Sequence, residues 1–241
     1  MRAMILAAGK GSRLRPLTDS VPKPLVEVAG RPMIAFALQL LRQADIHEVV
    51  INLHHLGDQI RRTLGDGSAY GARITYSEEN PILDTGGAIE AAREFLCNET
   101  FVVVNADVVI DLRLRDVIEF HHRHGAMATM VLRPDPQAER KDDIGIDAAR
   151  RIRRFLGRPY EAGPPSTGDR YLFASVHVFD RRLFDYMQPG VYSITRDVYP
   201  RLLAAGEPVY GYVHHGYWRV LDTSGDLAAG RRELAHCREK A

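Results

Sequence analysis

Cysteine and tryptophan are scarce in this chain, which has two cysteines and one tryptophan among 241 residues. Cys97 and Cys237 stand far apart without a paired spacing, so we read both as free thiols and expect neither a disulfide framework nor a zinc site. The chain also lacks an excess of one charge, because its 32 Lys and Arg residues nearly balance its 31 Asp and Glu residues and the formal net charge is +1. The chain therefore lacks a general attraction for nucleic acid or membranes, and any anion site depends on local placement of its cations.

Long apolar runs are missing as well. No segment reaches the ~18 apolar residues that span a bilayer, and the apolar run at residues 4–8 is too short for a signal peptide. We therefore expect a cytoplasmic protein without a nucleic-acid or membrane partner, as a monomer or a homodimer. With 45% hydrophobic and 26% charged residues, one large domain with a full core is favoured over two small ones.

Short apolar runs alternate with stretches of helical period in the first half of the chain, which is typical of a mainly parallel sheet with helices on both faces. Met33 and Phe36 share one helical face, and Ile60 and Leu64 share another. We predict a single-domain, Rossmann-like α/β fold with a mixed, mainly parallel sheet over residues 1–241. The first predicted strands lie near residues 2–7, 48–53, 72–77 and 101–106.

The second half continues the pattern with one interruption. The segment 133–170 is rich in prolines and charges, so we expect an excursion rather than core there. A final helix should begin at residues 223–226, Thr-Ser-Gly-Asp, which have the form of a capping box. Further helices are expected near residues 112–124 and 193–205, and strands near 128–132, 171–179, 208–214 and 217–221.

The most informative stretch is residues 6–25, Leu-Ala-Ala-Gly-Lys-Gly-Ser-Arg-Leu-Arg-Pro-Leu-Thr-Asp-Ser-Val-Pro-Lys-Pro-Leu, which begins at the end of the first strand. Gly9 and Gly11 allow backbone angles closed to other residues, so the N–H groups of the turn can point at anionic oxygens. Arg13 can bind two such oxygens at once. Lys23 lies between prolines that favour extended backbone and presents a point charge from a second direction. The stretch therefore predicts a polyphosphate site.

This turn fits neither of the two well-known phosphate loops, because it lacks the third glycine of the dinucleotide fingerprint and the Gly-Lys-Ser/Thr ending of a P-loop. The stretch instead resembles the signature L-A-A-G-x-G-x-R-L-x-P-L-T-x-x-x-P-K-P-L of the sugar-1-phosphate nucleotidyltransferases. These enzymes make nucleotide sugars from a nucleoside triphosphate and a sugar 1-phosphate and release pyrophosphate. The chain is similar to the family's short forms, the N-acetylmuramate-1-phosphate uridylyltransferases and mannose-1-phosphate guanylyltransferases.

The resemblance implies a division of labour within the chain. Residues 1–110 would form a nucleotide-binding half and residues 111–241 a sugar-phosphate-binding half, with Mg²⁺ as cofactor. Arg13 and Lys23 would be catalytic, with Arg13 on the outer phosphates and Lys23 on the α-phosphate and the sugar phosphate. The residues implied to bind the nucleotide in the first stretch are Leu6, Ala8, Gly9 and Gly11.

Asp107 follows the predicted strand 101–106 directly. In an open α/β sheet, ligands bind beyond the carboxyl ends of the strands, so this carboxylate is expected close to the phosphates. A hard cation with carboxylate and phosphate ligands offsets the repulsion between a sugar phosphate and a triphosphate. We therefore assign Asp107 as a Mg²⁺ ligand. The family motif here is usually N-G-D, and Ala106 replaces its glycine.

The second metal ligand of the family lies in a W-x-D-V-G-T motif, which this chain changes. Residues 218–223 read Trp-Arg-Val-Leu-Asp-Thr, so Val220 stands at the position of the ligand and Asp222 follows two residues later. If the strand continues, residues 220 and 222 project from the same face, about 7 Å apart. Either Asp222 supplies the second ligand, or Asp107, water and the phosphates hold the metal alone.

Residues 76–88 match the family's second signature, in which a polar residue after a strand meets the base and a Thr-Gly turn opens a helix. Thr85 and Gly86 are expected to line the nucleoside pocket. A carboxylate at Glu78 could accept two hydrogen bonds from guanine, whereas uracil or thymine is matched better by an amide. This favours GTP, and UTP stays open because short relatives that use UTP also carry an acidic residue here.

The acceptor side departs from the family pattern at two positions. The E-K-P motif appears as Gly157-Arg158-Pro159, so Arg158 keeps a cation for the sugar phosphate while the carboxylate is lost. In the later F-x-G-I motif, Ser175 replaces the glycine that lets sugar approach the backbone. Arg158 and Ser175 are therefore the expected sugar-phosphate contacts.

The histidines show no metal-ligand spacing. We read His121, His122 and His124 as residues of a solvated helix end. Asn52 or His54, at the end of the predicted strand 48–53, is expected to contact the ribose or base.

Together these residues predict a Mg²⁺-dependent nucleotidyltransferase that joins GTP or UTP to a sugar 1-phosphate. One alternative is a cytidylyltransferase acting on a non-sugar phosphate or phosphonate, which Gly157 and Ser175 make less remote. The other is a non-catalytic nucleotide-sugar-binding regulatory homologue. This alternative is suggested by Val220, which stands where the family has its second metal ligand.

Overall fold

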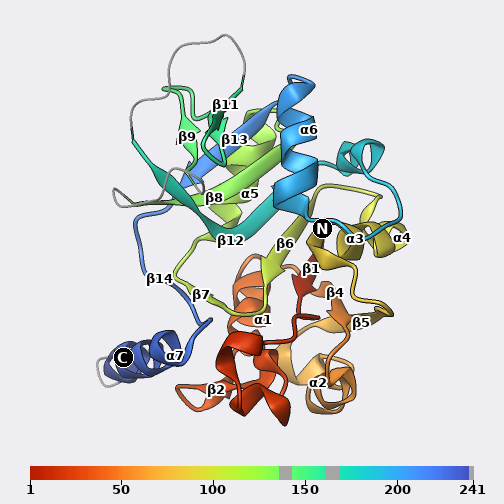
Figure 1. Ribbon diagram of the computed structural model, residues 1–241, viewed down its shortest axis with the longest axis vertical. Helices are drawn as coiled ribbons and strands as arrows, with labels where there is room; N and C mark the ends of the chain where they lie inside the picture. Colours follow the sequence, from red (N-terminus) through yellow and green to blue (C-terminus); the bar gives the residue numbers. More distant parts are fainter. Residues whose placement is uncertain (136–142, 161–168, 239–241) are drawn as a thin grey trace. The chain divides into compact units, whose positions relative to one another are not determined.

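The computed structural model describes residues 1–135, 143–160 and 169–238, with the backbone alone for 236–238 (Figure 1). Seven strands follow the order β13-β8-β12-β6-β1-β4-β5 in a mixed sheet, which confirms the predicted α/β class. The chain divides into two compact units. Unit 1 consists of residues 1–2, 83–103 and 113–216, and unit 2 of residues 3–82, 104–112 and those from 217 on.

Unit 2 is centred on the first parallel strands. In it β4 pairs in parallel with β5, from Glu48↔Arg73 to Leu53↔Glu78. Two small antiparallel pairs join β2 to β3 and β7 to β14. Its strands are β1 (Arg2–Leu6), β2 (Glu27–Val28), β3 (Arg31–Pro32), β4 (Glu48–Leu53), β5 (Arg73–Glu78), β7 (Val108–Ile110) and β14 (Trp218–Val220). Its helices are α1 (Ile34–Gln43), α2 (Gly57–Leu64) and α7 (Ser224–Arg238), with short 3₁₀ turns that include Ser12–Leu14 and Lys23–Leu25.

Unit 1 contains the antiparallel strand that makes the sheet mixed. There β12 runs antiparallel to β8, while β13 runs parallel to β8, and α5 packs against all three. Its strands are the first three residues of β6 (Phe101–Asn105), and β8 (Ala128–Pro134), β9 (Gly145–Ile146), β10 (Ile152–Phe155), β11 (Arg158–Pro159), β12 (Tyr171–Phe179) and β13 (Val209–Val213). Its helices are α3 (Asp84–Ala91), α4 (Arg93–Leu96), α5 (Leu114–Arg123) and α6 (Tyr199–Ala204).

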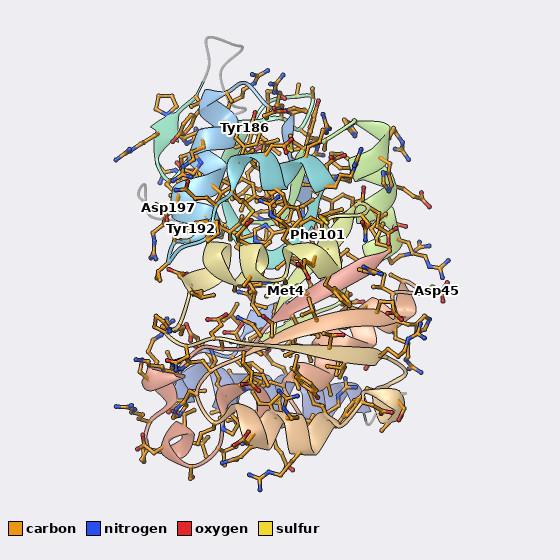
Figure 2. All side chains as sticks on the ribbon, turned by 90° about the vertical axis from the view of Figure 1, so that its right-hand side faces the viewer. Met4, Asp45, Phe101, Tyr186, Tyr192 and Asp197 are labelled. Carbon is orange, nitrogen blue, oxygen red and sulfur yellow. The ribbon has the colours of Figure 1, made fainter. Side chains whose placement is uncertain are left out.

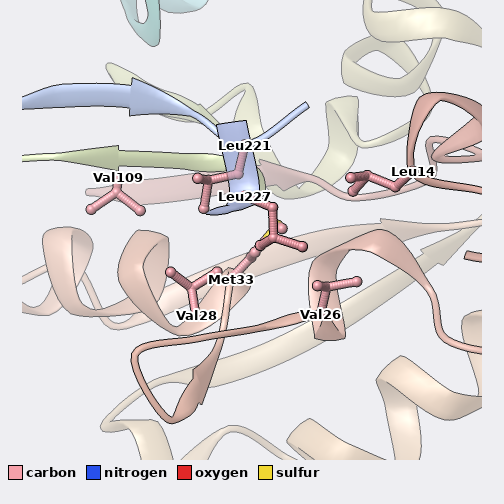
Figure 3. Close-up of a cluster of buried hydrophobic side chains, with 7 residues drawn as sticks. All are labelled: Leu14, Val26, Val28, Met33, Val109, Leu221 and Leu227. Atoms are coloured by element: carbon pink, nitrogen blue, oxygen red, sulfur yellow. The ribbon is translucent and has the colours of Figure 1, made fainter. Parts of the chain in front are cut away.

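A cluster of buried side chains unites parts of unit 2 that are far apart in the sequence (Figure 3). Each fully buried aliphatic side chain of this kind stabilises the fold by about 1.5–3 kcal/mol. The cluster fixes the glycine-rich stretch, β7 and the start of α7 beside one another. Its members are Leu14, Val26, Val28, Met33, Val109, Leu221 and Leu227.

The predicted capping box at the start of α7 is confirmed. The Asp226 N–H donates to Thr223 Oγ1 at 3.1 Å, and the Thr223 N–H donates to Asp226 Oδ2 at 3.0 Å. Two of the backbone donors that a helix start leaves open are thereby satisfied. The helix begins within two residues of Asp222, so the cap also fixes where the chain leaves β14.

Most predicted strands and helices agree with the observed ones within about two residues, but three segments differ. The predicted helix 193–205 begins as a π-helical turn, Ile194–Val198, before α6, since Pro200 has no N–H for the regular ladder. The described part of 133–170 is a three-stranded sheet, β11-β10-β9, with buried apolar side chains such as Phe155. It is therefore not an irregular excursion there, and residues 136–142 and 161–168 lie outside the described residues.

The third difference is in β12, where the predicted regular alternation is interrupted. The register with β8 shifts between Phe173 and His177, and Ser175 takes a φ of 66°. Left-handed backbone is costly for a residue with a Cβ and open to glycine. Ser175 thus holds a conformation that a glycine, the residue of the family motif at this position, could adopt without strain.

His177 and His121 are almost completely buried inside unit 1. His177 Nδ1 meets the Tyr199 hydroxyl at 2.8 Å, and burial lowers its pKa to about 3. His121, which we expected to be solvated, is buried against Thr129, and burial lowers its pKa to about 4; that expectation was wrong. Phe101, labelled in Figure 2, is part of the same interior and lies 5.6 Å from Phe179 between ring centroids.

Cys97 is a free thiol, as predicted, whereas the side chain of Cys237 lies outside the described residues. Among the helices of the described ranges, none combines the length and apolar character needed to cross a membrane.

The burial of His177 predicts a pH-dependent stability. The unfolded chain protonates this histidine near pH 6.5, whereas the folded chain keeps it neutral down to about pH 3. Protons therefore favour the unfolded state, and stability falls as the pH drops below 6.5. From pH 6.5 to 5 we expect His177 to contribute about 2 kcal/mol of this loss.

Urea unfolding at both pH values measures the effect. His177→Gln should lose about that much less stability than the wild type over this range. His47→Gln, at an exposed position, serves as the matched control and should keep the wild-type pH dependence. Equal pH dependence of the wild type and His177→Gln would contradict the assignment.

Candidate functional site

The glycine-rich stretch forms a tight loop directly after β1. Gly11 has a φ of 61°, and a Cβ placed there would lie 2.9 Å from Thr18 Cγ2 and 3.0 Å from Lys23 Cβ. The Thr18 hydroxyl donates to the Gly11 carbonyl oxygen at 2.8 Å. Gly11 is therefore required both by its backbone angle and by the close approach of Thr18 and Lys23. Gly9 and Lys10 are exposed at the tip of the loop.

Lys23 extends its ammonium group between two carboxylates. Its Nζ lies 2.5 Å from Asp107 Oδ2 and 2.8 Å from Asp222 Oδ1, and its side chain is only 11% exposed. Arg13 forms an ion pair with Oδ2 of Asp222. Two cations and two carboxylates therefore form one balanced network within unit 2.

Strand pairing explains why Asp107 and Asp222 meet although they lie 115 positions apart in the sequence. Asp107 lies in the turn between β6 and β7, and Asp222 follows β14 by two residues. Val220 of β14 pairs with Val108 of β7, and the Leu221 N–H donates to the Asp107 carbonyl oxygen at 2.9 Å. β14 ends at Val220, so Asp222 belongs to the turn that leads into α7.

The carboxylates of this network suit a divalent cation. Asp107 Oδ1 is buried and finds no hydrogen-bond partner among the described residues. In the same part of the chain, no set of three or more His, Cys, Asp or Glu is arranged to hold a metal. Mg²⁺ is commonly bound by one or two carboxylates together with water and substrate phosphates, so Asp107 and Asp222 fit such an ion, with Asp107 Oδ1 as an open ligand.

A pocket of about 310 Å³ lies at the carboxyl ends of β4 and β5 in unit 2. Glu78 and Glu79 both line it, but they differ in environment. The Glu78 side chain is 73% exposed and forms an ion pair with Arg61 at 2.5 Å. Glu79 is 5% exposed and accepts a hydrogen bond from Asn52 Nδ2 at 2.7 Å. The other residues that line the pocket are Leu53, His54, Leu56, Gly57, Asp58, Gln59 and Arg62.

Sequence reasoning singled out Glu78 and missed Glu79 and its bond to Asn52. The two acids are adjacent, and nothing in their local sequence distinguishes them. The sequence did offer one signal, because Asn52 is polar and follows the apolar residues 49–51 in β4, and a buried amide needs partners for both its donor and its acceptor.

Thr85 and Gly86 lie at the start of α3 in unit 1, packed against the segment around Tyr192. The Gly86 N–H donates to the Tyr192 carbonyl oxygen at 2.8 Å, and Thr85 Oγ1 accepts from the Ile194 N–H at 2.9 Å. A Cβ on Gly86 would lie 2.5 Å from the Tyr192 ring. Packing within unit 1 therefore explains both residue types, and their contact with a nucleoside stays a prediction.

The predicted acceptor contacts also lie in unit 1. Arg158 is exposed in β11, directly after the turn at Gly157, whose φ is 71°. Ser175 is buried at the irregularity of β12. Their contact with a sugar phosphate stays a prediction.

Residues 2–233 match the family model described as nucleotidyl transferase. The chain belongs to the nucleotidyl transferase family. The mannose-1-phosphate guanylyltransferase of Mycobacterium tuberculosis is 35% identical over 236 residues, which cover 96% of this chain and 64% of that protein. The N-acetylmuramate alpha-1-phosphate uridylyltransferase of Neisseria meningitidis serogroup B is 54% identical over 113 residues, 46% of this chain and 49% of that protein.

The fold is also similar to that of a solved structure. A Bacillus anthracis structure, assigned as a glucose-1-phosphate thymidylyltransferase and solved with sucrose, has a TM-score of 0.81 at 25% identity over 97% of this chain and 94% of that one. The matches between the present chain and the first curated relatives cover 57–64% of the length of those relatives. The names of these relatives differ in base and sugar, so family membership alone does not decide the substrates.

The position of Lys23 predicts how the free protein binds divalent cations. Because Asp107 and Asp222 contact the same ammonium group, their oxygens lie within roughly 5 Å of each other, and two such charges repel by about 3 kcal/mol at an effective dielectric of 20. Lys23→Met leaves that repulsion for an added cation to relieve. We expect Mn²⁺ to bind the free variant at least about tenfold more tightly than the wild type.

Electron paramagnetic resonance of Mn²⁺ measures this affinity without a nucleotide. Arg113→Met, which removes a cation whose side chain is 87% exposed, is the control and should behave as the wild type. Unchanged or weaker Mn²⁺ binding by Lys23→Met would show that the ammonium group does not occupy the cation site.

Proposed function

We propose that the protein is a Mg²⁺-dependent sugar-1-phosphate nucleotidyltransferase, which transfers a nucleotidyl group from a nucleoside triphosphate to a sugar 1-phosphate and releases pyrophosphate. The observation that carries the proposal is the network of Arg13, Lys23, Asp107 and Asp222 beside the glycine-rich loop of unit 2. The network combines cations for phosphate with carboxylates for a metal, and nucleotidyl transfer needs both.

For this reaction the protein must neutralise charge and position the reacting groups. An oxygen of the sugar phosphate forms a bond to the α-phosphorus while the bond from that phosphorus to the pyrophosphate oxygen breaks. The attacking oxygen is already ionised, so no general base is needed. Bound Mg²⁺ supplies charge neutralisation for the triphosphate and the leaving pyrophosphate, and Asp107 and Asp222 are the residues that would hold it.

Arg13 and Lys23 have a different task. In the free protein each is bound to a carboxylate, and a triphosphate offers competing oxygens. Arg13 would move to the outer phosphates, for which its planar guanidinium is suited. Lys23 would contact the α-phosphate and the sugar phosphate, where charge changes during transfer, so its main contribution is to the transition state.

Base and sugar recognition are assigned to separate groups. We propose that Glu79, rather than Glu78, meets the base, because Glu79 is buried in the pocket wall while Glu78 is exposed and paired with Arg61. A carboxylate at this position favours guanine through its two neighbouring donors. Arg158 would hold the sugar phosphate, and Thr85 the nucleoside.

Released pyrophosphate tests this function. The pure protein is incubated with Mg²⁺, each of ATP, GTP, UTP, CTP and dTTP, and a panel of sugar 1-phosphates. We expect turnover with GTP or UTP and a hexose 1-phosphate. Lys23→Ala should lower kcat/KM by at least about 100-fold, because it removes electrostatic stabilisation of the transition state, and Arg113→Ala should retain wild-type turnover.

The negative outcomes separate the alternatives. Turnover limited to CTP with a non-sugar phosphate or phosphonate would identify a cytidylyltransferase. Binding of a nucleotide sugar without turnover for any pair would support a regulatory role. A folded Lys23→Ala protein with near-normal turnover would remove Lys23 from the mechanism.

A further inference from the structure

Asn52 uses both ends of its amide group inside unit 2. It stands near the end of β4 and is 4% exposed. Its Oδ1 accepts a hydrogen bond from the Ala7 N–H at 2.7 Å, and its Nδ2 donates to Glu79 Oε1, also at 2.7 Å. Ala7 is the first residue after β1, where the glycine-rich loop begins, and Glu79 is the first residue after β5.

This arrangement requires a side chain with a donor and an acceptor on one planar group. A carboxylate at position 52 could accept from Ala7 but could not donate to Glu79. Glu79 is fixed a second time, because its own N–H donates to the Leu53 carbonyl oxygen at 2.8 Å. The position of the Glu79 carboxylate is thereby tied to β4, and the start of the loop is tied to that carboxylate.

We propose that Asn52 is a positioning residue that couples the phosphate-binding loop to the base-binding wall of the pocket. The proposal rests on the function proposed above. Asn52 therefore acts through Ala7 and Glu79 and is not itself a ligand of the nucleotide, contrary to the prediction from sequence. A base that displaces Glu79 also disturbs Ala7, so the wrong nucleotide is bound with a misplaced loop.

Exchanging the amide and the carboxylate tests this coupling. Asn52→Asp sets two carboxylates against each other and removes the donor that Asn52 Nδ2 supplies to Glu79. Glu79→Gln keeps a hydrogen bond to Asn52, because a glutamine oxygen can still accept. In the double variant Asn52→Asp/Glu79→Gln, the aspartate accepts from both the Ala7 N–H and the glutamine amide, so both side-chain hydrogen bonds of position 52 and the net charge of the pair are restored.

Two binding measurements test the phosphate-binding loop and the recognition of the base separately. Inorganic tripolyphosphate with Mg²⁺ probes the loop alone by isothermal titration calorimetry. We expect Asn52→Asp to weaken the binding of tripolyphosphate at least about tenfold. In the double variant, this affinity should return to within about threefold of the wild-type value. The ratio of GTP to UTP affinity probes Glu79, and it should change in Glu79→Gln and in the double variant alike. Asn98→Asp adds the same charge at an exposed position of unit 1 and should match the wild type in both affinities.

The outcomes distinguish the coupling from the function on which it rests. If the wild type binds tripolyphosphate and Asn52→Asp binds it equally well, or the double variant is no better than Asn52→Asp, the coupling is overturned and the proposed function stands. If the wild type does not bind tripolyphosphate, both fall. Circular dichroism checks folding, and if Asn52→Asp does not fold, the double variant decides: it must fold and bind as the wild type does, or the coupling is overturned.

Discussion

The ammonium group of Lys23, held between Asp107 and Asp222, is the interaction on which the candidate site depends. Without a cation between them, two carboxylates this close would repel each other. Lys23 thus serves the free protein as an internal counter-ion. The same charges that would act on phosphate and metal also balance one another in the free protein.

The surrounding packing makes this contact possible. Leu14 and Val26 from the glycine-rich stretch, Val109 from β7 and Leu221 after β14 share one buried cluster. Each lies within three residues of a member of the charge network or of its loop, so burial of apolar surface sets the distances between the charges. Gly11 completes the arrangement, because any side chain there would collide with Thr18 and the stem of Lys23.

Periodicity and motifs predicted the strands, the main helices and the capping box, because these depend on local sequence. What could not be predicted depends on side-chain pairing across distant segments. The sequence offered Asp222 and an unassisted Asp107 as equal alternatives for the metal site, and only the pairing of β14 with β7 brings Asp222 to Lys23. The contrast between Glu78 and Glu79 likewise depends on Asn52, a neighbour 27 residues away. His121 was misjudged because a polar residue in a histidine-rich stretch near a helix end gives no sign of what packs over it.

The central claim is that Asp107 and Asp222 share one divalent cation when a nucleoside triphosphate is bound. A double-mutant cycle on Mn²⁺ affinity, measured by electron paramagnetic resonance with saturating triphosphate, tests it most directly. Asp107→Asn and Asp222→Asn should each weaken Mn²⁺ binding, and the double variant should lose clearly less than the two single losses combined, because each single change already disrupts the shared site. Fully additive losses, or no loss in Asp222→Asn, would contradict a shared ion.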